Sequence, residues 1–80
     1  MNVQIYVTLK PAVLDPQGKA VENSLRRLGF KGAQNVRVGK YIQMSLEATD
    51  RKSAATQVRE MCEKLLSNPV IEDARYEFAE

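Results

Sequence analysis

The sequence predicts a small α+β domain in which an antiparallel sheet carries two helices on one face. Apolar and polar residues alternate over residues 2–10, over 35–48 and in the tail from Ala74, as they do in half-buried strands. Apolar residues recur at helical spacing over residues 15–28 and 51–66, and capping residues bound both segments. The resulting order, β-α-β-β-α-β, is the split βαβ or ferredoxin-like pattern.

The first helix has clear signals at both ends. Asp15 suits the N-cap, because its carboxylate can accept hydrogen bonds from the free amides of the first turn. Pro16 suits the first helical position, where its missing N–H has no cost. Gly29 can adopt the left-handed conformation that ends a helix, with Phe30 folding back on Leu25 as in a Schellman motif.

Gly18 lies inside this helix, where glycine costs about 1 kcal/mol relative to alanine. Capping explains Asp15 and Pro16, but it does not explain a glycine here. Two explanations remain open: a merely permissive position, or the close approach of another backbone segment, such as that of a second chain.

Residues 35–48 are predicted to form a hairpin. Val36 and Val38 face inward on the first strand of the hairpin, and the apolar pattern continues on its second strand. Gly39 and Lys40 supply the turn between the two strands, since glycine can adopt positive φ.

The second helix is predicted from about 51 to 66. Thr49 or Asp50 can cap its start, and Asn68 followed by Pro69 ends it. The tail then returns to strand alternation, with three inward-facing positions: Ala74, Tyr76 and Phe78.

The predicted sheet has one uncovered face. Right-handed crossovers place both helices on the same side, which leaves the other side bare. A chain of this length buries only about 60–65% of its unfolded surface, so we expect a single domain over residues 1–80 and no deep active site. A bare sheet favours self-association, and we expect at least a dimer formed through the sheet. The bare face would carry mostly uncharged polar side chains: Gln4, Tyr6, Thr8, Arg37, Gln43, Ser45 and Glu47.

Composition and charge are those of an ordinary globular chain, with 44% hydrophobic and 28% charged residues. No apolar run is long enough for a membrane span or a signal peptide, so we expect a cytoplasmic location and no membrane partner. The net charge of +2 is uneven, because residues 1–40 carry seven basic and two acidic side chains and residues 41–80 carry five and eight. This asymmetry can steer an acidic partner, but pairing of the two halves within a dimer is the favoured interpretation.

The residue types exclude most catalytic sites. The chain has no histidine, which excludes His-based general bases, triads and His–metal sites. Its single cysteine, Cys62, cannot form an internal disulfide or a zinc site, and its apolar surroundings favour a buried core thiol over a nucleophile. Asp15 is expected to be a helix cap rather than a catalytic acid. Tyr6 and Tyr41 alone do not make the aromatic pattern of an RNA-recognition sheet, so we expect no nucleic-acid partner.

Several runs of this sequence together resemble one family. They are Val7 to Pro11, Val13 to Gly18, Leu28 to Phe30, Val36 to Lys40 and Met61 to Glu72. The chain resembles the small subunit of phosphoribosylformylglycinamidine synthase, the PurS family, over nearly its whole length.

The resemblance implies a non-catalytic subunit in purine biosynthesis. It implies a homodimer, or a dimer of dimers, that bridges a glutaminase subunit and a large ATP-dependent synthetase subunit and supports ammonia transfer between them. The complex would use ATP, Mg and glutamine, with no cofactor bound directly by this chain. By the same motifs, eight residues are expected at the surface that meets partner subunits: Lys10, Pro11, Asp15, Pro16, Gly18, Arg37, Gly39 and Lys40.

Two other functions are compatible with the residues. One is a ferredoxin-like regulatory module that binds an amino acid at a dimer interface through the segment 11–18. The other is an RNA- or ribosome-associated module using five basic residues: Arg26, Arg27, Lys31, Arg37 and Lys40.

Overall fold

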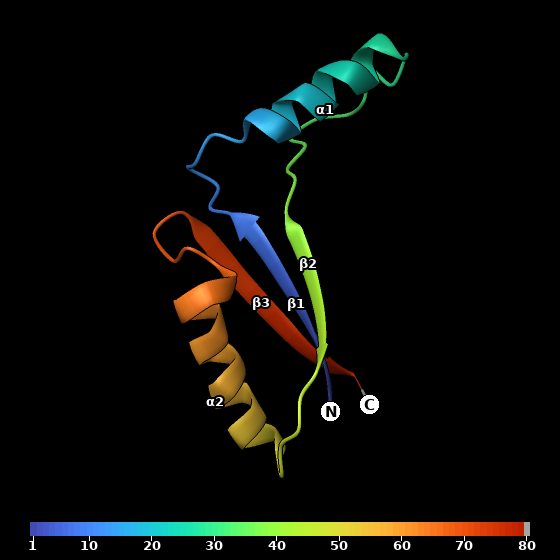
Figure 1. Cartoon of the computed structure of the whole chain (residues 1–80). Coiled ribbons are helices and arrows are strands. Elements are labelled where there is room, and N and C mark those ends of the chain that lie inside the picture. The colour runs from blue at the N-terminus through green and yellow to red at the C-terminus, as the bar shows by residue number, and fades with distance from the viewer. Residues whose placement is uncertain (80) are drawn as a thin grey trace.

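A three-stranded antiparallel sheet and two helices make up the fold. The computed structural model describes residues 1–79 (Figure 1). The strands are β1 (Asn2–Leu9), β2 (Lys40–Ser45) and β3 (Glu72–Ala79), in the order β2-β1-β3. The helices are α1 (Pro16–Arg27) and α2 (Arg51–Met61), and a π-helical turn, η1 (Cys62–Leu66), continues α2. The predicted α+β class with an antiparallel sheet is confirmed.

The core lies between the central strand and α2. Val3, Ile5 and Val7 are at most 1% exposed on one face of β1, as their alternation predicts. Ala54 and Val58 of α2 are fully buried against that face. The same face of the sheet contributes partly buried apolar side chains from the outer strands and from the segment after β2: Ile42, Met44, Leu46, Tyr76 and Phe78.

Both helices begin where their capping residues predict. The Asp15 carboxylate accepts a hydrogen bond of 2.8 Å from the Gly18 amide, and Pro16 occupies the first position of α1. The Asp50 carboxylate caps α2 through the Ser53 amide at 2.7 Å. Thus Asp50, rather than Thr49, is the cap.

The end of α1 is a Schellman motif, as predicted. Gly29 has a φ of 104°, in the left-handed region. The Phe30 amide donates to the Leu25 carbonyl oxygen at 3.0 Å, and the Gly29 amide donates to that of Arg26 at 3.1 Å. These two bonds satisfy carbonyl groups that the last helical turn leaves free.

The predicted hairpin over residues 35–48 does not form. β2 begins at Lys40 and pairs with β1, while residues 35–39 belong to no strand, so the element order is β-α-β-α-β. The amides of Val36 and Val38 donate instead to carboxylates of α1 and its cap. Gly39 makes no positive-φ turn; a Cβ on it would overlap the Val7 carbonyl oxygen, so glycine allows a close approach to β1.

Only one of the two helices lies over the sheet of its own chain. α2 runs along the sheet, whereas α1 projects beyond the end of the strands (Figure 1). Leu28 and Phe30 consequently remain 74% and 61% exposed. The radius of gyration is 15.8 Å, whereas a compact chain of this length has about 12 Å. The expectation of two helices on one face therefore holds for α2 but not for α1 within a single chain.

Candidate functional site

Residues 11–39 form an arm that stands off the end of the sheet. It consists of α1 and the chain that returns beside it (Figure 1). Two carboxylates fix the returning chain to the helix. Asp15 Oδ2 accepts from the Val38 amide at 2.8 Å, and Glu22 Oε1 accepts from the Val36 amide at 3.2 Å. Because Asp15 also caps α1, one side chain both begins the helix and holds the returning segment.

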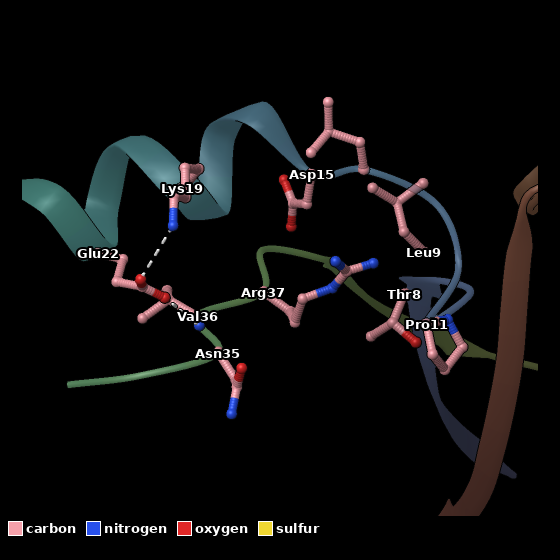
Figure 2. Close-up of a pocket in the computed structure, with 10 residues that line it drawn as sticks. Thr8, Leu9, Pro11, Asp15, Lys19, Glu22, Asn35, Val36 and Arg37 are labelled. Atoms are coloured by element: carbon pink, nitrogen blue, oxygen red, sulfur yellow. Dashed lines mark hydrogen bonds and ion pairs between the residues drawn. The ribbon is translucent and has the colours of Figure 1, made fainter.

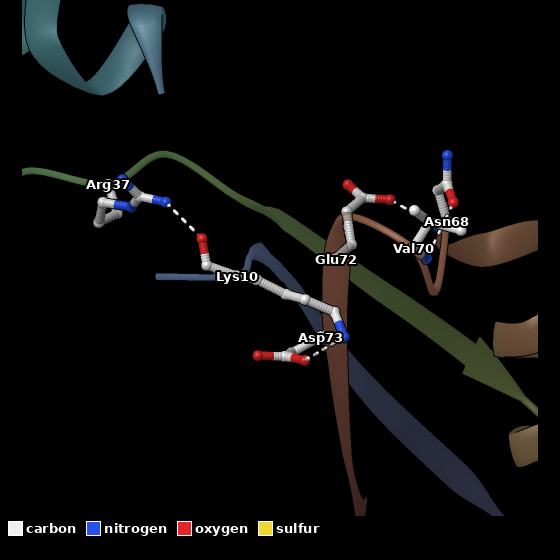
Figure 3. A network of polar contacts seen from close by, with 6 residues as sticks. All are labelled: Lys10, Arg37, Asn68, Val70, Glu72 and Asp73. Atoms are coloured by element: carbon white, nitrogen blue, oxygen red, sulfur yellow. Dashed lines mark hydrogen bonds and ion pairs between the residues drawn. The ribbon is translucent and has the colours of Figure 1, made fainter. Parts of the chain in front are cut away.

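Arg37 links the two connections between the arm and the sheet. Its Nη2 atom donates to the carbonyl oxygens of Lys10 at 3.0 Å and Val13 at 2.7 Å, and the first of these bonds is seen in Figure 3. A charged donor satisfying two carbonyl groups makes a strong contact. This geometry gives Arg37 a role inside the chain, and its predicted contact with a partner subunit stays a prediction.

Gly18 allows the returning chain to lie close to α1. A Cβ at this position would overlap the Val36 carbonyl oxygen and would lie 2.7 Å from Asp15 Oδ2. The close backbone approach that the sequence left open is thus made by the chain's own segment rather than by a second chain. Gly18 is required here for space, since its φ is not in the left-handed region.

A cleft of about 600 Å³ lies between the arm and the end of β1 (Figure 2). Its charged groups already have partners: Lys19 pairs with Glu22 at 3.4 Å, the carboxylates of Asp15 and Glu22 hold backbone amides, and Arg37 donates to two carbonyl oxygens. The lining residues are Thr8, Leu9, Pro11, Leu14, Asp15, Lys19, Glu22, Asn35, Val36 and Arg37.

The remaining predicted site residues lie around the same junction. Pro16, Gly39 and Lys40 line a neighbouring cleft of about 430 Å³. Lys40 Nζ donates to the Leu66 carbonyl oxygen at 3.5 Å, and Lys10 Nζ lies 3.9 Å from an Asp73 carboxylate oxygen (Figure 3). All eight residues therefore gather where the arm joins the sheet, and their contact with partner subunits stays a prediction.

Neither carboxylate of the arm is suited to acid–base catalysis near neutral pH. Hydrogen bonds from the Gly18 and Val38 amides lower the pKa of Asp15 below its ordinary value of 3.8. The Val36 amide lowers the pKa of Glu22 below 4.5, and the charge of Lys19 adds to this effect. Both groups are therefore ionised hydrogen-bond acceptors whose role is structural.

Glu22 is the important residue that the sequence interpretation missed. A signal was present, because Asp15, Gly18 and Glu22 are spaced i, i+3 and i+7 and share one face of α1. That face has two acceptors flanking a glycine, which is suited to a backbone lying against the helix. Glu22 is the third residue on that face, and in the structure it is buried and binds the Val36 amide of the returning segment.

Cys62 is a core thiol, as expected. It is the first residue of η1 and is buried in the core cluster. Desolvation raises its pKa, with a smaller contribution from the charge of Glu63. Within residues 1–79, no three His, Cys, Asp or Glu side chains come together in a way that could hold a metal ion. No helix in this part of the chain has the length and apolar character needed to cross a bilayer.

Comparisons with known proteins agree along nearly the whole chain. A family model described as PurS, phosphoribosylformylglycinamidine (FGAM) synthase, matches residues 2–80. The chain is 51% identical to the synthase subunit PurS of Bacillus subtilis over 79 residues, which covers 99% of this chain and 93% of that protein. It is also 51% identical to the corresponding Synechocystis subunit over 76 residues, covering 95% of this chain and 76% of that protein.

Solved structures give the same result. A crystal structure of Bacillus subtilis PurS superposes with a TM-score of 0.88 at 51% identity, over 99% of this chain and 98% of that one. A chain from the structure of PurLQS from Thermotoga maritima superposes with a TM-score of 0.88 at 33% identity, over 95% of this chain and 93% of that one.

The close approach at Gly18 gives a first testable prediction. Gly18→Ala should destabilise the chain by more than about 1 kcal/mol, even though alanine is the better helix former, because the methyl group displaces the Val36 carbonyl. Urea denaturation and amide exchange at Val36 and Val38 measure the effect. Gly32→Ala is the matched control, since its Cβ meets nothing within 4 Å; equal stability of the two variants would contradict the assigned contact.

The two carboxylates predict an acid-sensitive arm. Because the folded state lowers the pKa of both groups, their contribution is present above the ordinary values of 3.8 and 4.5 and is lost as the pH falls below them. Glu22→Gln should therefore flatten the decline of stability below pH 4.5, measured as denaturation midpoint against pH. Glu60→Gln is the control, because Glu60 is 60% exposed and pairs with Lys64 at the surface; an unchanged acid profile in Glu22→Gln would contradict the assignment.

Proposed function

The chain belongs to the PurS family of phosphoribosylformylglycinamidine synthase subunits, and on this basis we propose that it bridges the glutaminase and ATP-dependent synthetase subunits and supports ammonia transfer between them. It is a subunit of a ligase of purine biosynthesis. The reaction of the complex would convert formylglycinamide ribonucleotide to formylglycinamidine ribonucleotide. The likeness to a chain of the Thermotoga maritima PurLQS assembly is the observation that carries this proposal.

The geometry supports a bridging role better than a catalytic one. The charged groups in the larger cleft are already engaged within the chain. Asp15 and Glu22 hold the returning segment to α1, and Lys19 pairs with Glu22. Arg37 bonds to the Lys10 carbonyl in the connection from β1. They position a projecting element and leave no acid–base pair to act on a substrate. We therefore propose that the larger subunits bind ATP, Mg and glutamine. We also propose that the complex is cytoplasmic, as expected for a biosynthetic enzyme.

The exposed apolar side chains of the arm support the proposal that this chain forms a homodimer. Val21, Leu28 and Phe30 are 39%, 74% and 61% exposed, an apolar surface that one chain does not cover. The arm carries five basic and two acidic side chains, whereas residues 41–80 have a net charge of −3. We propose that α1 of each chain lies against the sheet of the other, beside β2, where Ile42 and Met44 are only partly buried. The net charges of the arm and of residues 41–80 are opposite in sign, which favours the approach of two chains.

Self-association through the arm is directly testable. The wild-type chain should have two or four times the monomer mass of 9.0 kDa in sedimentation equilibrium. Leu28→Ser should at least halve that mass, because its side chain is 74% exposed in one chain and would be buried between two. Leu65→Ser, at an 83% exposed position away from the arm, is the control. An unchanged mass for Leu28→Ser, with normal circular dichroism, would refute the arm contact.

Reconstitution tests the function itself. Glutamine-dependent synthesis by the two larger subunits should require this chain, whereas synthesis from added ammonia should proceed without it. Such a difference is expected because a bridging subunit affects delivery of ammonia and not the ligation step. If neither activity responds to the chain, the proposed function is wrong and a ligand-binding regulatory module becomes the better hypothesis.

A further inference from the structure

A tight turn at the base of the arm joins β1 to the segment that leads into α1. The Val13 amide donates to the Lys10 carbonyl oxygen at 2.9 Å, and Pro11 has the second position of the turn, which its fixed φ favours. The Lys10 amide donates to the Ile71 carbonyl oxygen at 2.9 Å, next to the start of β3. The first residue of the turn is therefore tied to the sheet.

Arg37 bonds to both ends of this turn. Its Nη2 atom donates to the carbonyl oxygens of Lys10 and Val13, so one nitrogen contacts the first residue of the turn and the last. Arg37 itself belongs to the returning segment, and the amides on either side of it are bonded to Glu22 and Asp15. These contacts form a continuous line from the sheet, through the turn and Arg37, to α1. Figure 3 shows the step from Arg37 to Lys10.

Packing does not fix the direction of the arm within one chain. α1 projects beyond the strands (Figure 1), and a cleft of about 600 Å³ separates the arm from the end of β1. The bonds of Asp15 and Glu22 join the two halves of the arm to each other, so the arm can turn as one unit without breaking them. A projecting unit with an open cleft behind it bends easily unless specific bonds at its base hold it.

Two other contacts at the base are weaker constraints on this direction. The Lys10 Nζ atom lies 3.9 Å from an Asp73 carboxylate oxygen, and an ion pair this exposed contributes little. Gly39 allows the returning segment to pass close to the Val7 carbonyl oxygen, which limits where the segment enters β2 and not where α1 points. The charged, double contact of Arg37 is the stronger one, and it reaches the arm itself.

We propose that Arg37 is the positioning residue of the arm. Its two bonds hold the returning segment against the turn, and this fixes the direction in which α1 carries Leu28 and Phe30 toward a second copy of the chain. Arg37 thus affects ammonia delivery through the arm, and not by touching a larger subunit. This inference deepens the proposed function and rests on it, because it needs a bridging role that the direction of the arm can affect.

Distances between spin labels test the position of the arm directly. The labels are attached at two exposed positions, Lys31→Cys on the arm and Gln57→Cys on α2, in a Cys62→Ala background, and their separation is measured by double electron–electron resonance. Labelled chains are refolded with an excess of unlabelled chains, so that each distance lies within one chain. Arg37→Gln should broaden the distance distribution, because the glutamine amide ends two bonds short of Nη2 and the turn loses this donor.

Two further variants separate geometry from charge. Arg37→Lys keeps the charge, but its side chain is one bond shorter, so it should also broaden the distribution. Arg27→Gln removes the same charge from an exposed position at the end of α1 and should keep the wild-type distribution. Circular dichroism and sedimentation verify that each variant is folded and has the wild-type mass under the conditions of measurement.

The reconstituted complex tests the consequence for function. With Arg37→Gln, glutamine-dependent synthesis should fall at least about fivefold, the effect of losing one hydrogen bond of ordinary strength, while ammonia-dependent synthesis stays unchanged. Arg27→Gln should support both at wild-type rates.

The outcomes separate this inference from the proposed function. Unchanged distances in Arg37→Gln would overturn the inference even if glutamine-dependent synthesis falls, because the guanidinium would then act by contacting a larger subunit. A broader distribution with undiminished synthesis would overturn it too, and a wild-type distribution in Arg37→Lys would show that charge alone suffices. If the wild-type chain supports no glutamine-dependent synthesis, the proposed function fails, while the distances still decide whether Arg37 holds the arm.

Discussion

The shape of this chain depends on one buried carboxylate. Asp15 accepts from the Gly18 amide to begin α1 and from the Val38 amide to hold the chain that returns beside it. Helix start and returning segment are thereby fixed to each other, and α1 points away from the sheet. The core under α2 does not need this carboxylate, but the projecting surface does. A structural hydrogen bond thus determines which surfaces are left for other chains.

The sequence predicted those elements whose signals are local. Asp15, Pro16 and Gly29 delimit α1 because capping depends on neighbouring residues, and Asp50 does the same for α2. The alternation in β1 correctly identified its buried face, because one side of this strand meets the core along its whole length. The sequence motifs around these elements also indicated the family, which the comparisons confirm.

The errors arose where a distant partner decides the structure. Val36 and Val38 alternate as a strand would, yet their amides bond to Glu22 and Asp15, 14 and 23 residues away. Gly39 resembles a turn glycine, but its neighbour is the β1 backbone. The site residues lie together at the arm junction. The spacing of Asp15, Gly18 and Glu22 indicates a backbone against α1, but it does not identify residues 36–38 as that backbone. The apolar stripe of α1 likewise predicts that this side of the helix is buried. It does not show whether the covering surface belongs to the same chain or to another one.

The carboxylates of the arm bond to main-chain amides rather than to side chains, and this has an evolutionary consequence. Every residue except proline offers such an amide. The side chains at positions 36 and 38 can therefore change while the arm keeps its orientation, provided that Asp15, Gly18 and Glu22 remain. Lineages can remodel the outer surface of this segment to follow changes in a partner without redesigning the joint that carries it.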